Sequence, residues 1–380
     1  MYQYQKTKTY LAQVPEDIKE LAEEELKSLG AKETKLTYRG IYFKADKETL
    51  YRINYNARLI IRVLAPLISF DCHSDRYLYK TAFNNIRWED FLKKDSSFFI
   101  IANVSNSKIK HSRYAAQRLK DAIADYFNKK FGKRPSVKKE NSDIILNLFI
   151  RNNRAIISVD TSGGSLHKRG YRVESVEAPM SEVLAAAIIK LSGWRGEVPL
   201  YDPFCGSGTI LCEAYMVITN TPAAFLREKF GFELLPDYDF NLWQKVKSES
   251  NKKIVEVEKG IIAGSDISES AVNAAKKNCS LIDENGRIKI EKKDFRDIKF
   301  EKKKIIITNP PYGIRLKTET PIENLYKEIG DFFKRELKGS AAFVYFGNRG
   351  LIKKIGLKPS FKKILYNGGL EGRLVKYDIF

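Results

Sequence analysis

The sequence predicts an α/β protein, with a doubly wound parallel sheet at its C-terminal end and α+β units before it. From residue 163 onward, strand patterns alternate with helix patterns, which is typical of a doubly wound sheet. Before that point, helices and strands are short and mixed, which is typical of α+β packing. The glycine-rich polar stretch 161–165 separates the two patterns and is the expected domain boundary.

Residues 1–60 are expected to form the first α+β unit. Apolar residues recur at helical spacing over 15–30, acidic residues crowd the first turn, and Gly30 ends the helix. A short strand is expected before this helix and another at 40–43 after it. A further helix is expected over 58–66.

The second unit, residues 61–162, is expected to combine strands with one long helix whose apolar residues share a face. Its elements are the strands 98–104, 143–150 and 155–160 and the helix 112–128.

Residues 163–380 follow the strand-then-helix pattern of a parallel sheet. The expected strands are 198–201, 260–265, 287–292, 303–308 and 341–346, and the expected helices are 208–219, 268–278 and 321–337. Residues 220–258 are too many for a simple connection between a strand and a helix, so they are interpreted as an insertion.

Positive charge is concentrated in one part of the chain. The formal net charge is +20, and residues 51–170 carry 23 Lys and Arg against 10 Asp and Glu, a net of +13. A solvated basic surface would explain such a bias without a partner. Because the excess is so localised, a polyanion such as nucleic acid is the favoured partner.

Membrane and metal functions find little support in the sequence. No apolar stretch approaches the ~20 residues of a membrane span, and the N-terminal residues lack the apolar segment of a signal peptide. The four cysteines form no C-x-x-C pair and there are three histidines, so no metal site is expected. A cytoplasmic protein is therefore expected.

The tetrapeptide Asn309-Pro310-Pro311-Tyr312 directly follows an apolar run that is expected to be a buried strand. Ligands of open α/β sheets bind at the carboxyl ends of such strands. Two prolines stiffen the loop and remove two backbone donors, which leaves carbonyl acceptors beside an amide and a ring. This combination suits a planar base with an exocyclic amine, although an Asn-Pro turn is the simpler alternative.

A second loop, residues 202–209, lies between an expected strand and an expected helix. Gly206 and Gly208 would let the backbone approach a ligand and turn into the helix. The loop begins with Asp202, which would face an amino-bearing ligand better than a pyrophosphate. A tight turn with an aspartate cap is the alternative, and Cys205 is interpreted as a small residue tolerated there rather than as a nucleophile.

Acidic residues also follow the next two expected strands. Asp266 is placed to hold ribose hydroxyls, or alternatively to cap the following helix, a task that Ser268 could also perform. Asp294 and Phe295 could bind the amino group and the face of an adenine. Taken alone, that pair is better interpreted as a loop acid beside a core phenylalanine.

In this order, the four loops resemble those of class I, Rossmann-like S-adenosylmethionine-dependent methyltransferases that modify exocyclic amines. Along the whole chain, the sequence is similar to the THUMP-containing RNA guanine-N2 methyltransferases of the RlmL/YpsC type, within the UPF0020 family of NPPY methylases. The segments that carry this narrower resemblance are Val14-Pro15-Glu16, Glu23-Glu24-Glu25-Leu26, 120–125, 166–172 and 178–182.

The resemblance implies a domain order. It implies a ferredoxin-like domain at 1–60, a THUMP RNA-binding domain at 61–162 and a methyltransferase domain at 163–380. Large members of the family carry a second methyltransferase after this one, and this chain ends at Phe380, so a single modification is expected.

The resemblance also implies residue roles. Asn309 and the Pro310 carbonyl would accept hydrogen bonds from the target amine, within a catalytic loop completed by Pro311 and Tyr312, and Tyr312 would stack on the base. The cofactor, S-adenosyl-L-methionine, would be held by Pro179, Met180, Asp202, Phe204, Gly206, Gly208, Asp266, Ile267, Asp294, Phe295 and Asn309.

The implied partner is RNA, with large-subunit 23S ribosomal RNA as the expected substrate. The basic residues expected to contact it are Lys108, Lys110, Arg113, Arg118, Lys133, Arg134, Lys168 and Arg169. For the last two, a solvated linker is the alternative. The alternatives to the function are a transfer-RNA guanine-N2 methyltransferase, a DNA adenine-N6 methyltransferase and a non-catalytic RNA-binding assembly factor. The oligomeric state is left open.

Overall fold

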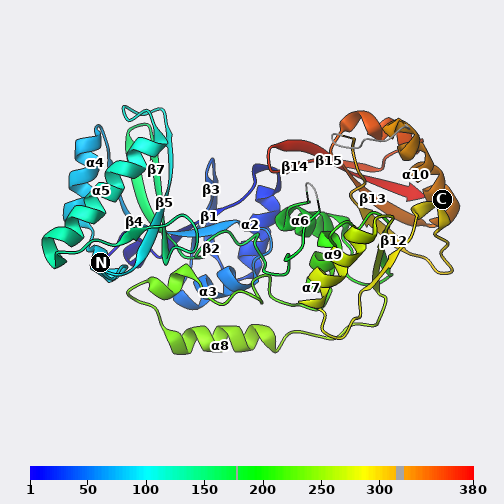
Figure 1. Cartoon of the computed structure of the whole chain (residues 1–380), viewed down its shortest axis with the longest axis horizontal. Coiled ribbons are helices and arrows are strands. Elements are labelled where there is room, and N and C mark those ends of the chain that lie inside the picture. The colour runs from blue at the N-terminus through cyan, green and yellow to red at the C-terminus, as the bar shows by residue number, and fades with distance from the viewer. Residues whose placement is uncertain (177–178, 314–320) are drawn as a thin grey trace. The chain divides into compact units, whose positions relative to one another are not determined.

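The computed structural model describes residues 1–176, 179–313 and 321–380, and two β-sheets lie within these ranges (Figure 1). The sheets belong to different compact units. The N-terminal unit comprises residues 1–14, 22–166 and 227–249, and the C-terminal unit comprises residues 15–21, 167–226 and 250–380. No helix of the described residues is long and apolar enough to cross a membrane.

The N-terminal unit is built on an eight-stranded sheet with the order β2-β3-β1-β4-β8-β7-β5-β6. Its strands are β1 (Thr9–Gln13), β2 (Lys32–Thr37), β3 (Gly40–Lys44), β4 (Arg62–Asp71), β5 (Ser97–Ser105), β6 (Ser136–Val137), β7 (Ile144–Arg151) and β8 (Arg154–Asp160). The helices up to residue 166 are α1 (Gln3–Thr7), α2 (Lys19–Ser28), α3 (Lys47–Asn56), α4 (Asp75–Asn85) and α5 (Ser112–Phe131).

The long helix α5 forms where its apolar spacing predicts. Ala115, Leu119, Ala122 and Ile123 are buried on one face, and Gly132 ends the helix in a left-handed conformation. The helix connects β5 to β6, and both β6 and β7 run parallel to β5.

The helix expected over 58–66 is wrong, because residues 62–71 form β4. This strand lies between β1 and β8, and residues 63–67 are all buried. A strand that is buried on both faces shows a continuous apolar run rather than alternation, so its sequence cannot be told from that of a buried helix.

The C-terminal unit contains a seven-stranded sheet with the order β11-β10-β9-β12-β13-β15-β14. Its strands are β9 (Leu200–Asp202), β10 (Ile262–Asp266), β11 (Lys289–Lys292), β12 (Ile305–Thr308), β13 (Ser340–Phe346), β14 (Phe361–Asn367) and β15 (Leu370–Ile379). The first five of these strands are parallel, whereas β15 runs antiparallel to β13 and β14. The predicted fold class is confirmed, although the final hairpin β14–β15 was not expected.

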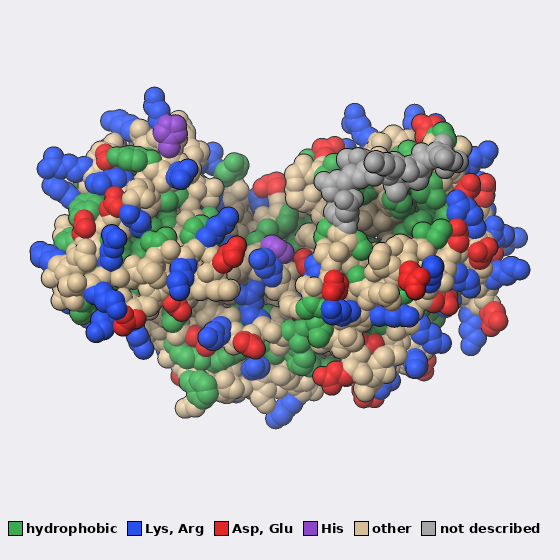
Figure 2. Space-filling model, in the orientation of Figure 1, with side chains coloured by type: hydrophobic (Ala, Val, Ile, Leu, Met, Phe, Trp, Pro, Cys, Tyr) green, Lys and Arg blue, Asp and Glu red, His purple; other side chains and the backbone are tan. Residues whose placement is uncertain are grey.

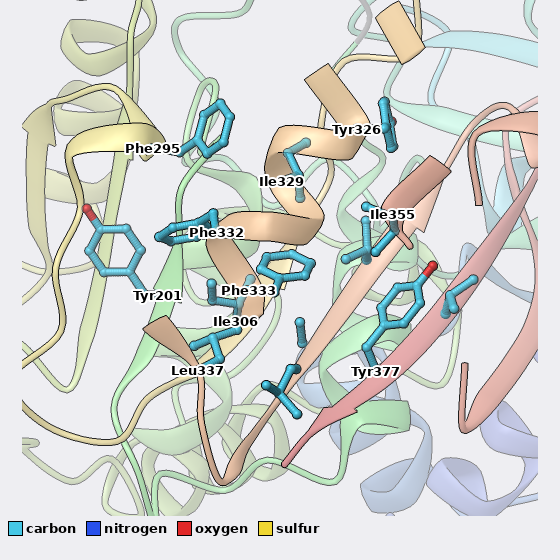
Figure 3. Packing of buried hydrophobic residues seen from close by; sticks show 14 of the residues in the cluster. Tyr201, Phe295, Ile306, Tyr326, Ile329, Phe332, Phe333, Leu337, Ile355 and Tyr377 are labelled. Carbon is cyan, nitrogen blue, oxygen red and sulfur yellow. The ribbon is translucent and has the colours of Figure 1, made fainter. Parts of the chain in front are cut away.

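Helices α6 (Glu182–Ser192), α7 (Thr209–Ile218), α9 (Glu269–Ser280) and α10 (Ile322–Glu336) pack with this sheet. Figure 3 shows how α10 is seated: Tyr326, Ile329, Phe332 and Phe333 project from it into a core shared with β12 and the later strands. Since this core includes Ile306, in the middle of β12, it fixes the strand that leads into the predicted Asn309 loop.

The segment interpreted as an insertion carries α8 (Phe240–Asn251), and residues 227–249 belong to the N-terminal unit. Trp243 is buried there. Its ring centroid lies 5.3 Å from that of Tyr55 on α3 and 5.2 Å from that of Phe232. The sequence signal of an over-long connection therefore corresponds to a segment that leaves one unit and packs in the other.

Candidate active site

The carboxyl ends of three adjacent strands carry the predicted polar residues. Asp202 is the last residue of β9, Asp266 is the last residue of β10, and Asn309 directly follows β12. β9 pairs with β10 on one side and with β12 on the other. The strand order therefore progresses outward from β9 in opposite directions, through β10 on one side and β12 on the other, which makes this edge the topological switch point where open α/β sheets bind ligands.

Asp202 is enclosed at this edge, with 1 % of its surface exposed. Its Oδ1 atom accepts hydrogen bonds from Thr308 Oγ1 at 2.6 Å and from the Phe204 backbone N–H at 3.1 Å. Burial raises the pKa of Asp202 to about 7, and the nearby charge of Asp266 adds to the rise. A positively charged ligand group would favour the ionised carboxylate.

The loop after Asp202 needs its glycines for two different reasons. Gly206 and Gly208 both have positive φ angles, 52° and 83°, which favour glycine. A Cβ atom on Gly208 would also lie 3.2 Å from both Ala275 Cβ and Cys279 Sγ. Glycine at this position therefore lets the start of α7 lie directly against α9.

Asp266 connects this loop to the next one. Its Oδ2 atom accepts a hydrogen bond from the Gly206 backbone N–H at 3.0 Å, and its Oδ1 atom accepts one from the Ser268 N–H at 2.9 Å. The N-cap of α9 is Ser268, not Asp266. Ile267, which lies between them, is largely exposed. The carboxylate of Asp266 thus holds two loops together at the edge where a ribose is expected.

Asp294 and Phe295 form the start of the short helix η4 (Phe295–Asp297). Asp294 Oδ1 accepts a hydrogen bond from the Arg296 backbone N–H at 2.9 Å, and Asp294 Oδ2 forms an ion pair with Arg296 Nη1 at 2.8 Å. The Phe295 ring is buried, with its centroid 5.0 Å from that of Phe204 and 5.8 Å from that of Phe332 (Figure 3). Contacts of this pair with an adenine stay a prediction.

The side-chain amide oxygen of Asn309 accepts no hydrogen bond from the described residues. This Oδ1 atom is buried. Leaving a buried amide oxygen unsatisfied costs about 1–3 kcal/mol, so such atoms in folded proteins call for an explanation. A ligand N–H group would satisfy this atom.

The Tyr312 ring lies flat against Gly347, the residue after β13. A Cβ atom on Gly347 would come within 2.8 Å of the ring atoms Cδ1, Cδ2 and Cε1. The ring also packs against the core that contains Tyr326 and Phe346. Gly347 therefore fixes the position of one face of this ring, a contact that sequence reasoning missed.

The segment expected to close over the cofactor is described from Pro179 onward; Glu177 and Ala178 lie outside the described residues. Met180 is buried, and its carbonyl oxygen accepts a hydrogen bond from Arg172 Nη2 at 2.8 Å. Arg172 Nε also pairs with Glu182 at 2.8 Å. These contacts tie the start of α6 to the connector before it.

The predicted RNA-contacting residues of the N-terminal unit lie at two ends of its sheet. Lys108, Lys110 and Arg113 follow the carboxyl end of β5 and are exposed. Lys133 and Arg134 precede β6, which pairs with the amino end of β5. Figure 2 shows many Lys and Arg side chains over the part of the molecule that holds α4 and α5.

Some of these cations already have partners. Arg118 lies near Asp75 and Asp121, at 3.4 Å from each, and Lys133 pairs with Asp95. Lys168 interacts with other residues of the chain.

The prediction that Arg169 contacts RNA is wrong, because its side chain is buried inside the protein. Its Nε atom lies 3.2 Å from Glu213 Oε1, which also accepts a hydrogen bond from the Tyr171 hydroxyl at 2.9 Å. A buried guanidinium requires such a partner. A signal was available: Glu213 is the lone charged residue in the apolar helix α7, which predicts a buried cation opposite it.

No group of His, Cys, Asp and Glu in the described ranges could hold a metal ion.

Family models match the chain in three places: an "RMKL-like, methyltransferase domain" over residues 169–376, a THUMP domain over 78–160 and an "RlmL ferredoxin-like domain" over 9–64.

Two curated relatives illustrate the similarity. A Synechocystis sp. protein that bears the name of an RNA methyltransferase is 36% identical over 98% of this chain and 97% of its own length. The ribosomal RNA large subunit methyltransferase K/L of Syntrophotalea carbinolica is 36% identical over 97% of this chain and 53% of its own length. This chain thus spans about half the length of the K/L relatives.

Two solved structures have the same fold over nearly the full chain. A methyltransferase complexed with S-adenosylhomocysteine has a TM-score of 0.85 at 28% identity and covers 98% of both chains. A predicted N6-adenine-specific DNA methylase from Listeria monocytogenes has a TM-score of 0.84 at 25% identity, over 98% of this chain and 96% of that one.

Proposed function

Because this chain belongs to the RMKL-like methyltransferase family, whose cofactor is S-adenosylmethionine, we propose that it methylates the exocyclic N2 of a guanine in large-subunit 23S ribosomal RNA. The THUMP match and the names of the K/L relatives support RNA as the substrate. In this proposal residues 1–60 are the ferredoxin-like domain, 61–162 the THUMP domain and 163–380 the methyltransferase domain.

The single observation that carries the proposal is the unsatisfied Oδ1 atom of Asn309 at the switch point. One N–H of the target amine would donate to this atom and the other to the Pro310 carbonyl. An aryl amine is a poor nucleophile because its lone pair is delocalised into the ring. Two acceptors on its N–H groups favour a pyramidal nitrogen and aim the lone pair, so that positioning supplies much of the acceleration.

The residues at this edge also fit the cofactor. S-adenosylmethionine supplies an electrophilic methyl group on a cationic sulfonium. Asp202, whose pKa burial raises to about 7, would bind its positive methionine end, with the Gly206–Gly208 turn close to it. Asp266 would accept hydrogen bonds from the ribose hydroxyls. The amine loses its proton easily once it carries the new methyl group, so no strong general base is required.

DNA adenine-N6 methylation is the second candidate, because an adenine amine could use the same two acceptors and the Listeria protein bears such a name. A THUMP domain favours RNA over it. A transfer-RNA guanine and a non-catalytic RNA-binding role remain the other candidates.

In the test, the protein and labelled S-adenosylmethionine are incubated with unmodified ribosomal RNA, with tRNA or with DNA in three separate reactions. Nucleoside analysis of each nucleic acid follows. N2-methylguanosine in ribosomal RNA is the expected product. The same product only in tRNA selects the tRNA enzyme, N6-methyladenine in DNA contradicts the RNA proposal, and RNA binding without transfer selects the non-catalytic role. Asn309→Ala tests the role of this residue: it is expected to abolish transfer but to leave cofactor binding mostly intact, unlike Asp266→Ala.

A further inference from the structure

Tyr38 is a large aromatic side chain that the N-terminal unit leaves in solvent. It lies in the turn between β2 and β3, and 76 % of its surface is exposed. An apolar ring so far out of the core gains little from burial. Burial in the core therefore does not explain its position.

The turn that carries Tyr38 is held firmly in place. Arg39, the next residue, donates a hydrogen bond from Nη2 to Asn147 Oδ1 at 2.9 Å, and its guanidinium lies 3.7 Å from the centroid of the Phe149 ring. Both partners are on β7. The hairpin belongs to the segment matched by the ferredoxin-like model and β7 to the segment matched by the THUMP model, so the two segments build one surface within the N-terminal unit.

Arg151, at the end of β7, covers one face of the exposed ring. Its guanidinium lies 4.4 Å from the ring centroid of Tyr38, a cation–π contact. Within the described ranges no carboxylate forms an ion pair with Arg151. A guanidinium stacked in this way keeps its N–H groups at the rim of the ring, where they can bind a phosphate.

A second loop brings further cations to the same end of the sheet. Lys108 donates its backbone N–H to Asn153 Oδ1 at 2.8 Å, and the Ser107 hydroxyl donates to the same atom at 3.1 Å. Asn153 lies in the turn that directly follows Arg151. These contacts fasten the Lys108 backbone to the turn that follows Arg151, and the described residues provide no ion-pair partner for Lys108 either.

We propose that Tyr38 and Arg151 form a stacking site for one unpaired nucleobase of the RNA substrate, with Arg151 and Lys108 on the adjacent phosphates. The inference rests on the proposed RNA function and extends it to a site away from the Asn309 loop. An exposed ring offers its face to a base, and bases in a duplex are already stacked on their neighbours. Cations that form no ion pair within the described residues are available to bind a polyanion.

The first experiment measures binding of the full-length protein to a labelled, unstructured oligouridylate of about 12 nucleotides, a length within the range that single-strand sites cover. Tyr38→Ala is expected to weaken binding by about 5- to 150-fold, the range that base stacking contributes. Tyr38→Phe keeps the ring and is expected to bind as the wild type does. Phe240→Ala is the matched control, because the Phe240 ring is also exposed, with 61 % of its surface in solvent, and lies in the same unit.

The second measurement separates charge from stacking. Arg151→Ala is expected to reduce the salt dependence of log K by about 0.7 for each phosphate that the variant no longer binds, whereas Tyr38→Ala leaves the slope unchanged. Lys139→Ala is the control for general charge, since Lys139 follows β6 at the opposite end of the sheet.

Equal affinities for wild type and Tyr38→Ala would overturn the proposal, as would equal losses for Tyr38→Ala and Phe240→Ala. If Tyr38→Ala preferred single-stranded over duplex RNA as strongly as the wild type does, that would likewise contradict an unpaired base at this site. If the wild-type protein binds no RNA at all, the proposed RNA function fails instead, so the two failures are distinguishable.

Discussion

At the residue scale, Asp202 couples cofactor binding to pH. Its pKa is about 7 in the folded protein against an ordinary value of 3.8, so its contribution to stability is present at acid pH and is lost as the pH rises from about 4 to about 7. A cationic ligand pulls the pKa back down. S-adenosylmethionine is therefore expected to bind more tightly as the pH rises from about 6 to 7, as the carboxyl of the free protein ionises.

Calorimetric titration across this pH range checks the expectation. Asp202→Asn should flatten the rise in affinity, and Asp266→Asn should weaken binding while keeping the rise. A rise that persists in Asp202→Asn would assign the titration to another group.

Gly347 gives the second residue-scale prediction, because any side chain there meets the Tyr312 ring. In Gly347→Ala the ring must move by a fraction of an ångström, which is expected to slow methyl transfer by roughly 10-fold or more, since misplacement of about 1 Å can cost 100-fold. Cofactor affinity should not change. Gly369→Ala is the matched control, because a Cβ atom on Gly369 meets nothing within 4 Å.

A double-mutant cycle tests whether Gly347 acts through the ring. In a Tyr312→Ala background the further change Gly347→Ala should have no additional effect on the transfer rate. Additive losses would mean that Gly347 acts on something other than Tyr312.

At the element scale, the attachment of α7 depends on the buried pair Arg169–Glu213. Arg169→Met leaves Glu213 buried without its cation and is expected to cost about 3–5 kcal/mol in the free energy of unfolding by urea. Replacing both residues by apolar ones should recover much of this loss. Lys277→Met, which removes an exposed pair with Glu174, is the control and should cost less than about 1 kcal/mol.

This pair also shows what the sequence could and could not predict. The strand-then-helix pattern predicted the parallel sheet because its period is local, and it placed Asp202, Asp266 and Asn309 after successive strands. The apolar surroundings of Glu213 in α7 predict a buried cation, but no local pattern identifies Arg169, 44 residues away, as that cation. β4 was mistaken for a helix for a related reason, since only its two neighbouring strands explain its unbroken apolar run.

At the scale of the whole molecule, the chain passes between its units more than once. Residues 227–249 belong to the N-terminal unit although the chain before and after them builds the C-terminal one. The buried rings of Trp243 and Phe232 lie against Tyr51 of α3, at centroid distances of 6.3 and 4.4 Å. The N-terminal unit therefore completes its core with residues from the later part of the sequence.

Trp243→Ala tests this dependence. Loss of a buried tryptophan is expected to cost about 3–5 kcal/mol. Because the indole ring packs against α3, hydrogen exchange should accelerate first in Lys47–Asn56 and in β8, and less in β9 and β12. Phe240→Ala, on the exposed side of α8, should leave all four segments unchanged. Uniform acceleration in both units would show that they unfold as one, which contradicts a separate core completed by this segment.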